Sequence, residues 1–177
     1  MPKTKTAKKS PKNQSTPAGC TAGLPQVPPL YGLKSPHQFL PFTHAARRLA
    51  KSRNYWICTT RPDGRPHSIP VWGFWLDGGL YFGTARSTRK ARNLAHNPAI
   101  SVHLESGDDV VILEGAAEEV DLTDKPTLKK LDAASRAKYR MPLMVMPESV
   151  VYSIHPRVVL AWTESDFPNN ATRWQFT

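Results

Sequence analysis

The stretch RPDGRPHSIPVWGFWLDGGLYFGTARSTRKARNLAHNP, residues 61–98, combines turn, strand and helix signals within 38 residues. Its Asp63-Gly64 pair is a strong hairpin signal, since a tight turn needs residues that tolerate a positive φ. The apolar runs 67–76 and 80–84 are typical of strands joined by a second turn over residues 77–79. Residues 87–97 then repeat with a helical period. The stretch therefore predicts antiparallel strands followed by a helix that packs on them.

The helix predicted over residues 87–97 begins with cations, where cations are unfavourable. Four basic residues stand at this point: Arg86, Arg89, Lys90 and Arg92. The free amides at a helix N-terminus already carry partial positive charge. A bound anion would remove the conflict, and the hydroxyls of Ser87 and Thr88 would add donors. The start of this helix is thus a candidate phosphate site, with a solvated polar helix face as the alternative.

Strand and helix patterns continue on both sides of this stretch. Helices are expected over residues 43–54 and 124–139, and strands over 55–60, 99–105, 109–120, 149–162 and 171–176. Within the helix at 87–97, Ala91, Leu94 and Ala95 are expected to face the core. The total is six or seven mostly antiparallel strands with flanking helices. Such a pattern predicts a mainly β fold, a small barrel with helices on its outside.

The formal net charge of +10 is concentrated at the front of the chain. No Asp or Glu precedes Asp63, and residues 1–62 hold 11 Lys or Arg. We expect residues 1–35, rich in Lys and Pro, to be a disordered basic tail, and residues 36–177 to form one domain. Nucleic acid is an unlikely partner, because only the basic tail would bind it, through unspecific phosphate contacts. We expect neither a secretory signal nor a membrane partner, because no apolar run is long enough.

Common catalytic and metal-binding patterns are missing from the sequence. The six His are scattered, and neither a nucleophile–base pair nor a metal-ligand spacing is found. The dinucleotide-binding and P-loop fingerprints are also missing. Cys20 lies in the tail, and Cys58 lies in an apolar strand pattern and is expected to be inert core. We therefore predict no catalytic side chain, no metal and no disulfide scaffold, and a reducing cytoplasm as the location.

Aromatic residues form a second cluster in the sequence. The predicted strands carry Trp72, Phe74, Trp75, Tyr81 and Phe82. Most of these should be core or interface residues, although some could flank a flat ring. Trp162 and Trp174 lie near the polar C-terminal end, where burial in the core of a monomer is hard to explain. They suit a dimer interface or a surface that stacks on a ligand.

Together with ISVHLE (100–105), DVVILEG (109–115) and ATRWQF (171–176), the stretch 61–98 closely resembles the split-barrel flavin/deazaflavin oxidoreductase superfamily. This group is usually called pyridoxamine 5'-phosphate oxidase-like, and the resemblance covers about residues 43–177. It implies an antiparallel FMN-binding split β-barrel. It also implies a homodimer with two cofactor sites at the subunit interface, which hold FMN or the deazaflavin coenzyme F420.

The resemblance implies which residues hold the cofactor. Its phosphate region is expected at Ser87, Thr88, Arg89 and Lys90. Contacts at the end of the preceding strand are expected from Gly83 and Thr84. The strand along the ring is expected to supply His67, Ser68, Ile69 and Pro70, mostly through backbone groups. Trp162 and Arg173 are expected to reach across from the other subunit.

Two departures from the family pattern argue against vitamin B6 oxidation. The stretch LDAASRAKYRMP (131–142) does not clearly reproduce the Tyr, Arg and Ser of the substrate-phosphate site, and NNATRWQF (169–176) lacks the His of the terminal Arg-x-His clamp. The sequence looks more like the F420-using subgroup, whose longer cofactor would suit Arg86 and Arg92. We predict hydride transfer between F420 or FMN and a small organic substrate. The alternative is a non-enzymatic haem, flavin or F420 carrier or sensor, in which His96, His103 or His155 matter.

Overall fold

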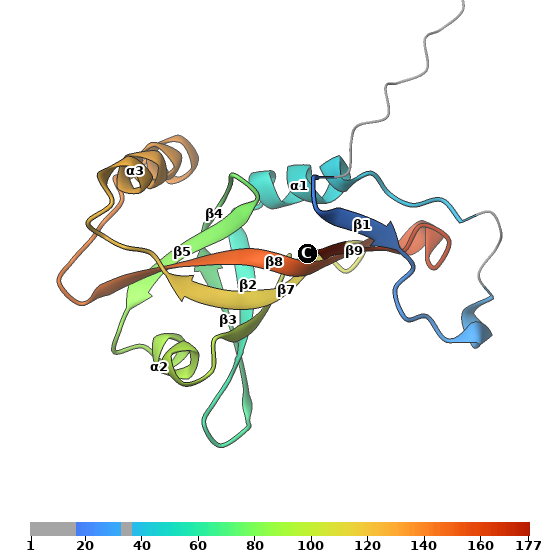
Figure 1. Cartoon of the computed structure of the whole chain (residues 1–177), viewed down its shortest axis with the longest axis horizontal. Coiled ribbons are helices and arrows are strands. Elements are labelled where there is room, and N and C mark those ends of the chain that lie inside the picture. Colours follow the sequence, from blue (N-terminus) through green and yellow to red (C-terminus); the bar gives the residue numbers. More distant parts are fainter. Residues whose placement is uncertain (1–16, 33–36) are drawn as a thin grey trace, which may run out of the picture.

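The computed structural model describes residues 17–32 and 37–177, which form one sheet with helices around it (Figure 1). The described helices are α1 (Phe42–Lys51), α2 (Arg89–His96), α3 (Lys125–Tyr139) and the short 3-10 helices η1 (Pro29–Tyr31) and η2 (Glu164–Asp166). The described strands are β1 (Cys20–Gly23), β2 (Asn54–Thr60), β3 (Pro66–Trp72), β4 (Phe74–Leu76), β5 (Gly79–Ala85), β6 (Ala99–His103), β7 (Asp109–Glu119), β8 (Ser149–Thr163) and β9 (Thr172–Phe176). The mainly antiparallel β fold with flanking helices is confirmed.

Strand β8 divides the barrel into two parts. The strand order is β1-β9-β8-β7-β6-β2-β3, and the hairpin β4–β5 joins β8 outside this path. One edge of β8 pairs with β7 along nearly its whole length. The other edge pairs with β5 over residues 149–154 and with β9 over residues 158–161. The start of α2, which follows β5, and the strand β9 therefore lie near opposite ends of β8 (Figure 1).

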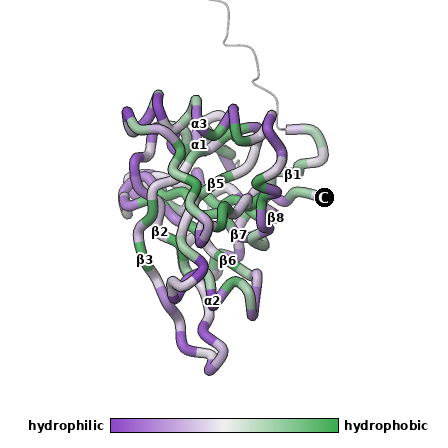
Figure 2. The backbone as a smooth tube through the Cα atoms, turned by 90° about the vertical axis from the view of Figure 1, so that its left-hand side faces the viewer, coloured by the Kyte–Doolittle hydropathy of each residue, from purple (hydrophilic) through white to green (hydrophobic). Residues whose placement is uncertain are grey.

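The core fills the barrel because alternate strand residues point inward. Along β2 the buried residues are Tyr55, Ile57 and Thr59, with more exposed residues between them. Figure 2 shows hydrophobic segments along the strands and a hydrophilic tip on the β2–β3 hairpin. Trp174 is 1 % exposed in this core, so the expectation that it lies at an interface or over a ligand is wrong. Inward alternation along β9 places it there despite its polar neighbours.

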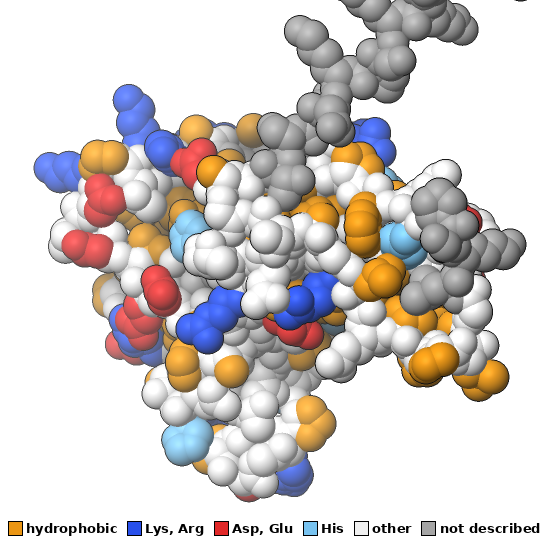
Figure 3. Space-filling view, turned by 45° about the vertical axis from the view of Figure 1, so that its right-hand side comes forward, with side chains coloured by type: hydrophobic (Ala, Val, Ile, Leu, Met, Phe, Trp, Pro, Cys, Tyr) orange, Lys and Arg blue, Asp and Glu red, His pale blue; other side chains and the backbone are white. Residues whose placement is uncertain are grey.

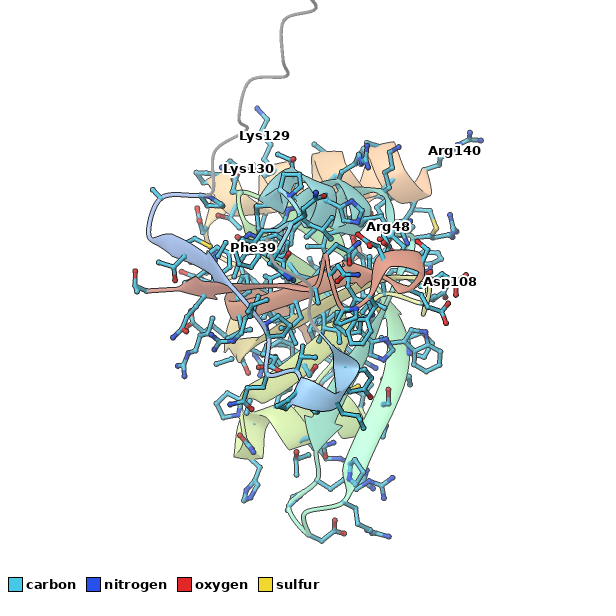
Figure 4. All side chains as sticks on the ribbon, turned by 90° about the vertical axis from the view of Figure 1, so that its right-hand side faces the viewer. Phe39, Arg48, Asp108, Lys129, Lys130 and Arg140 are labelled. Carbon is cyan, nitrogen blue, oxygen red and sulfur yellow. The ribbon has the colours of Figure 1, made fainter. Side chains whose placement is uncertain are left out.

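Helix α1 covers one end of the barrel, with Ala45 and Leu49 fully buried. Its polar face is tied to the start of β7, where His44 Nε2 lies 2.7 Å and Arg48 Nε 3.1 Å from the carboxylate of Asp109. Helix α3 lies on the same side of the molecule, and Lys129 of this helix and Arg140, which directly follows it, point to solvent (Figure 4).

The single strand predicted over residues 67–76 is two strands, β3 and β4, which are separated at Gly73. A Cβ at Gly73 would lie 2.8 Å from the carbonyl oxygen of Tyr81 and 3.2 Å from the ring of Tyr55. Only glycine allows the backbone to come this close, so the chain bends here from the β2–β3 pair to the β4–β5 hairpin.

The disordered tail predicted for residues 1–35 is wrong for residues 17–32. Strand β1 pairs with β9 in antiparallel register, from Cys20 opposite Phe176 to Gly23 opposite Arg173. The following turn packs Tyr31 against Phe167, with ring centroids 5.6 Å apart. Backbone hydrogen bonds to the edge of β9 need few apolar side chains, which is why the composition did not indicate them. The rest of the predicted tail, 1–16 and 33–35, lies outside the described residues.

Candidate functional site

The N-terminus of α2 begins at a threonine cap. Thr88 Oγ1 accepts from the amide of Ala91 (3.4 Å) and donates to the carbonyl of Ala85 (2.8 Å). The hydroxyl of Thr84 lies 3.1 Å from the same oxygen. The cap uses the Thr88 hydroxyl, so the exposed Ser87 is the freer donor. The first amides of a helix have no acceptor within it, and those before Ala91 remain available to an anion.

Helix α2 packs on β2 through a polar contact. Ala91 and Leu94 are buried, as predicted, but Ala95 is exposed and Asn93 is fully buried instead. The Asn93 Nδ2 donates to Oγ1 of Thr59 over 2.9 Å. A hydroxyl in the barrel wall therefore compensates part of the cost of burying the Asn93 amide, whose position the sequence pattern did not predict.

Three cations from two parts of the fold gather around His67. Arg89 and Lys90 come from the first turn of α2, and Arg61 comes from the end of β2. Burial lowers the pKa of His67, and the charges of Arg61, Lys90 and Arg89 lower it further. Burial also lowers the pKa of Lys90. Among residues 17–32 and 37–177, none of the three cations has an ion-pair partner.

Asp63, in the turn after β2, makes its hydrogen bonds to Arg65, although the charges of Arg61 and Arg89 also contribute to its lowered pKa. Its two oxygens accept the Nη2, the Nε and the backbone amide of Arg65, at 2.7, 3.0 and 3.1 Å. These bonds are the main reason why the pKa of Asp63 is lowered. Arg86, the other cation just before α2, is bound by both oxygens of Glu119, at 2.7 and 2.9 Å. The free positive charge is therefore at Arg61, Arg89 and Lys90.

Buried polar atoms without a partner surround the same place. They are Nδ1 of His67, Nε of Arg61 and Oδ1 of Asn93. His67 lies directly opposite Thr59 in the β2–β3 register, and Thr59 holds Asn93. Buried polar groups are nearly always hydrogen-bonded in proteins. The orphaned nitrogens of Arg61 and His67, together with the unpaired Arg89 and Lys90, fit an anionic group such as a phosphate, whereas the Asn93 oxygen would need a separate donor.

Strand β3 presents backbone groups beside this cluster because β3 is the last strand of the sheet path. Its side chains alternate, with His67 and Ile69 half-buried and Ser68 and Pro70 exposed. Proline has no N–H, and in an edge strand its nitrogen faces away from the neighbour. Backbone nitrogens two residues apart in a strand point to the same side. Because the nitrogens of Pro66 and Pro70 face away from β2, the N–H of Ser68 between them also points away from β2. A planar ligand along β3 would meet this donor.

Gly83 and Thr84 link the cluster to the barrel wall. Both belong to β5, where Gly83 pairs with Val151 and Thr84 with Val150. Gly83 is exposed, and a Cβ there would make only ordinary contacts, 3.9 Å from Val151 and 4.0 Å from the Val150 carbonyl. Among the described residues, no neighbour therefore requires a glycine at this position.

The structure does not bring Trp162 and Arg173 to this cluster. Trp162 is near the end of β8, and Arg173 pairs with Leu160 on β9, whereas β5 and α2 adjoin the first half of β8. The two residues line a cavity of about 700 Å³ together with the N-terminal residues 24–28. Within one chain they belong to a separate place, and they can join the cluster only from a second copy.

Sequence reasoning missed Arg61 and Asn93. Arg61 directly precedes the Pro62-Asp63-Gly64 turn, a position that predicts exposure rather than a role. Asn93 carries no local signal, because only the packing of α2 on β2 reveals its partner.

In the described part of the chain no cluster of His, Cys, Asp or Glu could hold a metal ion. Among these residues no helix has the length and apolar character that a membrane crossing requires. Cys58 is partly exposed, with Sγ 3.3 Å from Oγ of Ser68, so its assignment to the core is wrong.

The family model described as pyridoxamine 5'-phosphate oxidase matches residues 42–163, well over half of the chain. The chain belongs to this family, and the resemblance inferred from the sequence is confirmed. The match covers α1, the β2–β3 hairpin, α2 and all of β8, so it contains the whole cation cluster. No curated protein sequence matches the chain.

Several solved structures are similar to this chain. A conserved hypothetical protein of Mycobacterium tuberculosis, Rv2991, is 26 % identical with a TM-score of 0.62, over 74 % of this chain and 89 % of its own. The General Stress Protein 26 of Bacillus anthracis is 25 % identical with a TM-score of 0.56, over 67 % and 91 %. A protein described as an F420 reductase is 24 % identical with a TM-score of 0.50, over 64 % and 94 %. Proteins described as haem-binding and FAD-binding also share the fold.

Proposed function

We propose that this protein is an oxidoreductase that transfers a hydride between a bound flavin-type cofactor, F420 or FMN, and a small organic substrate. The observation that carries the proposal is the cluster of Arg61, Arg89 and Lys90, with its free helix amides and buried orphaned nitrogens. Among the described residues, no carboxylate lies within ion-pair distance of these three cations. Every member of this set favours a phosphate. The family match supports the same cofactor class.

The residues of this chain would hold and orient the cofactor, and the bound ring would supply the hydride chemistry. Arg89, Lys90 and the exposed Ser87 would bind the phosphate, with Arg61 on its other side. The free N–H of Ser68 would face the ring edge, where a fixed donor stabilises negative charge that develops on reduction. No acid or base side chain is needed for this role.

F420 is the slightly favoured cofactor. The excess of positive charge suits a longer anionic tail, and Arg92 is a further exposed cation on α2. Arg86, which the sequence suggested for this purpose, is bound to Glu119 and is a weaker candidate. A fold neighbour described as an F420 reductase points the same way.

A titration with FMN and with F420, followed by fluorescence, tests the cofactor site. The double variant Arg89→Ala, Lys90→Ala should weaken binding by about 100-fold or more, since it removes two charge-assisted contacts. Arg86→Ala is the matched control, because that charge is already neutralised and its loss should leave binding nearly unchanged. Equal affinity of the double variant and the wild type would disprove the phosphate assignment.

Turnover then separates an enzyme from a carrier. The reduced cofactor, once bound, should be oxidised by an unsaturated organic acceptor under anaerobic conditions in the presence of the wild-type protein. A protein that binds the cofactor tightly but never oxidises it across a panel of such acceptors would be the carrier or sensor instead. A haem titration belongs to the same experiment, because any one of His96, His103 and His155 would be a candidate axial ligand in a haem carrier.

A further inference from the structure

A cavity in the described part of the chain lies far from the start of α2. Its floor is the outer face of β7, β8 and β9, and its wall is the segment Leu24–Tyr31, which we call the strap. Hydrophobic side chains gather on this side of the molecule, on the right of Figure 3. The volume, about 700 Å³, lies within the range of about 300–1,000 Å³ typical of small-molecule sites.

Three aromatic rings from three segments form one corner of this cavity. Tyr31 of the strap meets Phe167 edge-on at 5.6 Å, with an angle of 79° between the rings. Trp162 of β8 lies on another side of Phe167, with centroids 5.7 Å apart at 52°. All three line the cavity and are partly exposed within it. Rings held at such angles present both faces and edges, which suits a flat, apolar guest.

One cation is available beside these rings. Arg173 lines the cavity, and its Nη1 donates to Oε1 of Gln175 over 2.7 Å. Glu114 also lines the cavity, but among the described residues no carboxylate is within ion-pair distance of Arg173. A guanidinium has five donors in a planar fork that matches a carboxylate. Arg173 therefore has donors to spare for an anionic group that enters the cavity.

We propose that the strap cavity binds a flat aromatic or conjugated molecule with one carboxylate, held by the three rings and by Arg173. We propose further that this ligand is the substrate. This second step rests on the proposed function and on the expectation from the family resemblance that Trp162 and Arg173 reach the cofactor of the second subunit. The strap would then form the substrate side of a site whose cofactor side is α2 and β3 of the partner.

Calorimetric titration with 1-naphthoate tests the cavity directly, with 1-naphthalenemethanol as the uncharged ligand of the same ring. The wild type should bind one naphthoate per chain. Arg173→Gln should weaken naphthoate about tenfold or more and leave the alcohol nearly unchanged. Tyr31→Ala should weaken both ligands. Arg157→Gln, which removes an exposed cation of the neighbouring strand β8, is the control that should change neither.

The outcomes separate the cavity from the proposed function. Saturable naphthoate binding that depends on Arg173 in the folded protein supports the cavity, whether or not FMN or F420 binds. Loss of naphthoate binding in Arg157→Gln to the same degree, or no saturable binding by the wild type, would overturn it. In the Arg89→Ala, Lys90→Ala variant, naphthoate binding should persist while cofactor binding is lost. If the wild type binds naphthoate but no cofactor, the proposed function fails and only the binding site stands.

Discussion

His67 has an unfavourable electrostatic environment until an anion arrives. Burial of the imidazole lowers its pKa, and the charges of Arg61, Lys90 and Arg89 lower it further. Its Nδ1 has no partner in the described protein. A phosphate among the cations would cancel most of their field and could accept a proton from the imidazole. His67 is therefore a natural reporter of occupancy.

We expect the pKa of His67 to rise when FMN or inorganic phosphate binds. Because anion and proton then favour each other, phosphate affinity should increase as the pH falls through the pKa of His67. An NMR titration of the imidazole signals with and without FMN measures this. His96, exposed at the other end of α2, is the internal control. An unchanged pKa of His67 at saturating FMN would place the phosphate elsewhere.

The C-terminal turn of α3 is tied to the break between β3 and β4. Lys138 Nζ donates to the Tyr55 hydroxyl (2.8 Å) and to the carbonyl of Gly73 (3.0 Å). Tyr139 donates to the carbonyl of Arg53 (2.7 Å), and its ring stacks on Trp72. A helix with a weak apolar face is thus held by polar contacts at the one place where the sheet backbone bends.

Lys138 should make stability depend on pH. Burial lowers its pKa to about 8, whereas an unfolded lysine titrates near about 10.4. Between these values the unfolded chain binds more protons, so the free energy of unfolding should rise with pH. The free energies of unfolding in urea of the wild type and of Lys138→Met should diverge over this interval. Both proteins keep the nearby tyrosines, so the contribution of the tyrosines cancels when the two free energies are subtracted. Lys129→Met, on the exposed face of α3, should follow the wild type. Parallel profiles for wild type and Lys138→Met would refute the assignment.

The two halves of the proposed site lie at opposite ends of the folded protein. The cation cluster belongs to α2 and the β2–β3 hairpin, and Trp162 and Arg173 belong to the far end of β8 and to β9 (Figure 1). A symmetric dimer would bring the end of β8 in one copy to α2 in the other, and would do so twice. We propose this arrangement as the functional form.

Mixing two defective variants tests the shared site. Arg89→Ala, Lys90→Ala breaks the first half, and Trp162→Ala breaks the second. Each variant alone should bind F420 or FMN weakly. After the two are unfolded together and refolded, random pairing makes about half of the dimers mixed, and each mixed dimer regains one intact site, so about a quarter of the sites should recover. No recovery, with mixed dimers shown to be present, would mean that each site is built within one chain.

Much of the fold was readable from neighbouring residues. The Asp63-Gly64 turn, the period-two strands and the start of α2 at Thr88 were predicted close to their observed positions. The break at Gly73 was missed, because it depends on a carbonyl eight residues along the chain that approaches within 2.8 Å of a Cβ. Strand β1 was missed because its stability comes from the edge of β9, more than 150 residues away.

For the site, the sequence alone determined that cations and hydroxyls crowd the start of one helix, since these are consecutive residues and helical geometry places them together. The tertiary structure alone decided which of those cations are free. It pairs Arg86 with Glu119 and brings Arg61 and His67 from the β2–β3 hairpin to Arg89. It also places Trp162 and Arg173 under the strap rather than near α2. Such choices depend on strand register and on contacts between distant residues, which no local pattern of apolar, charged or turn residues contains.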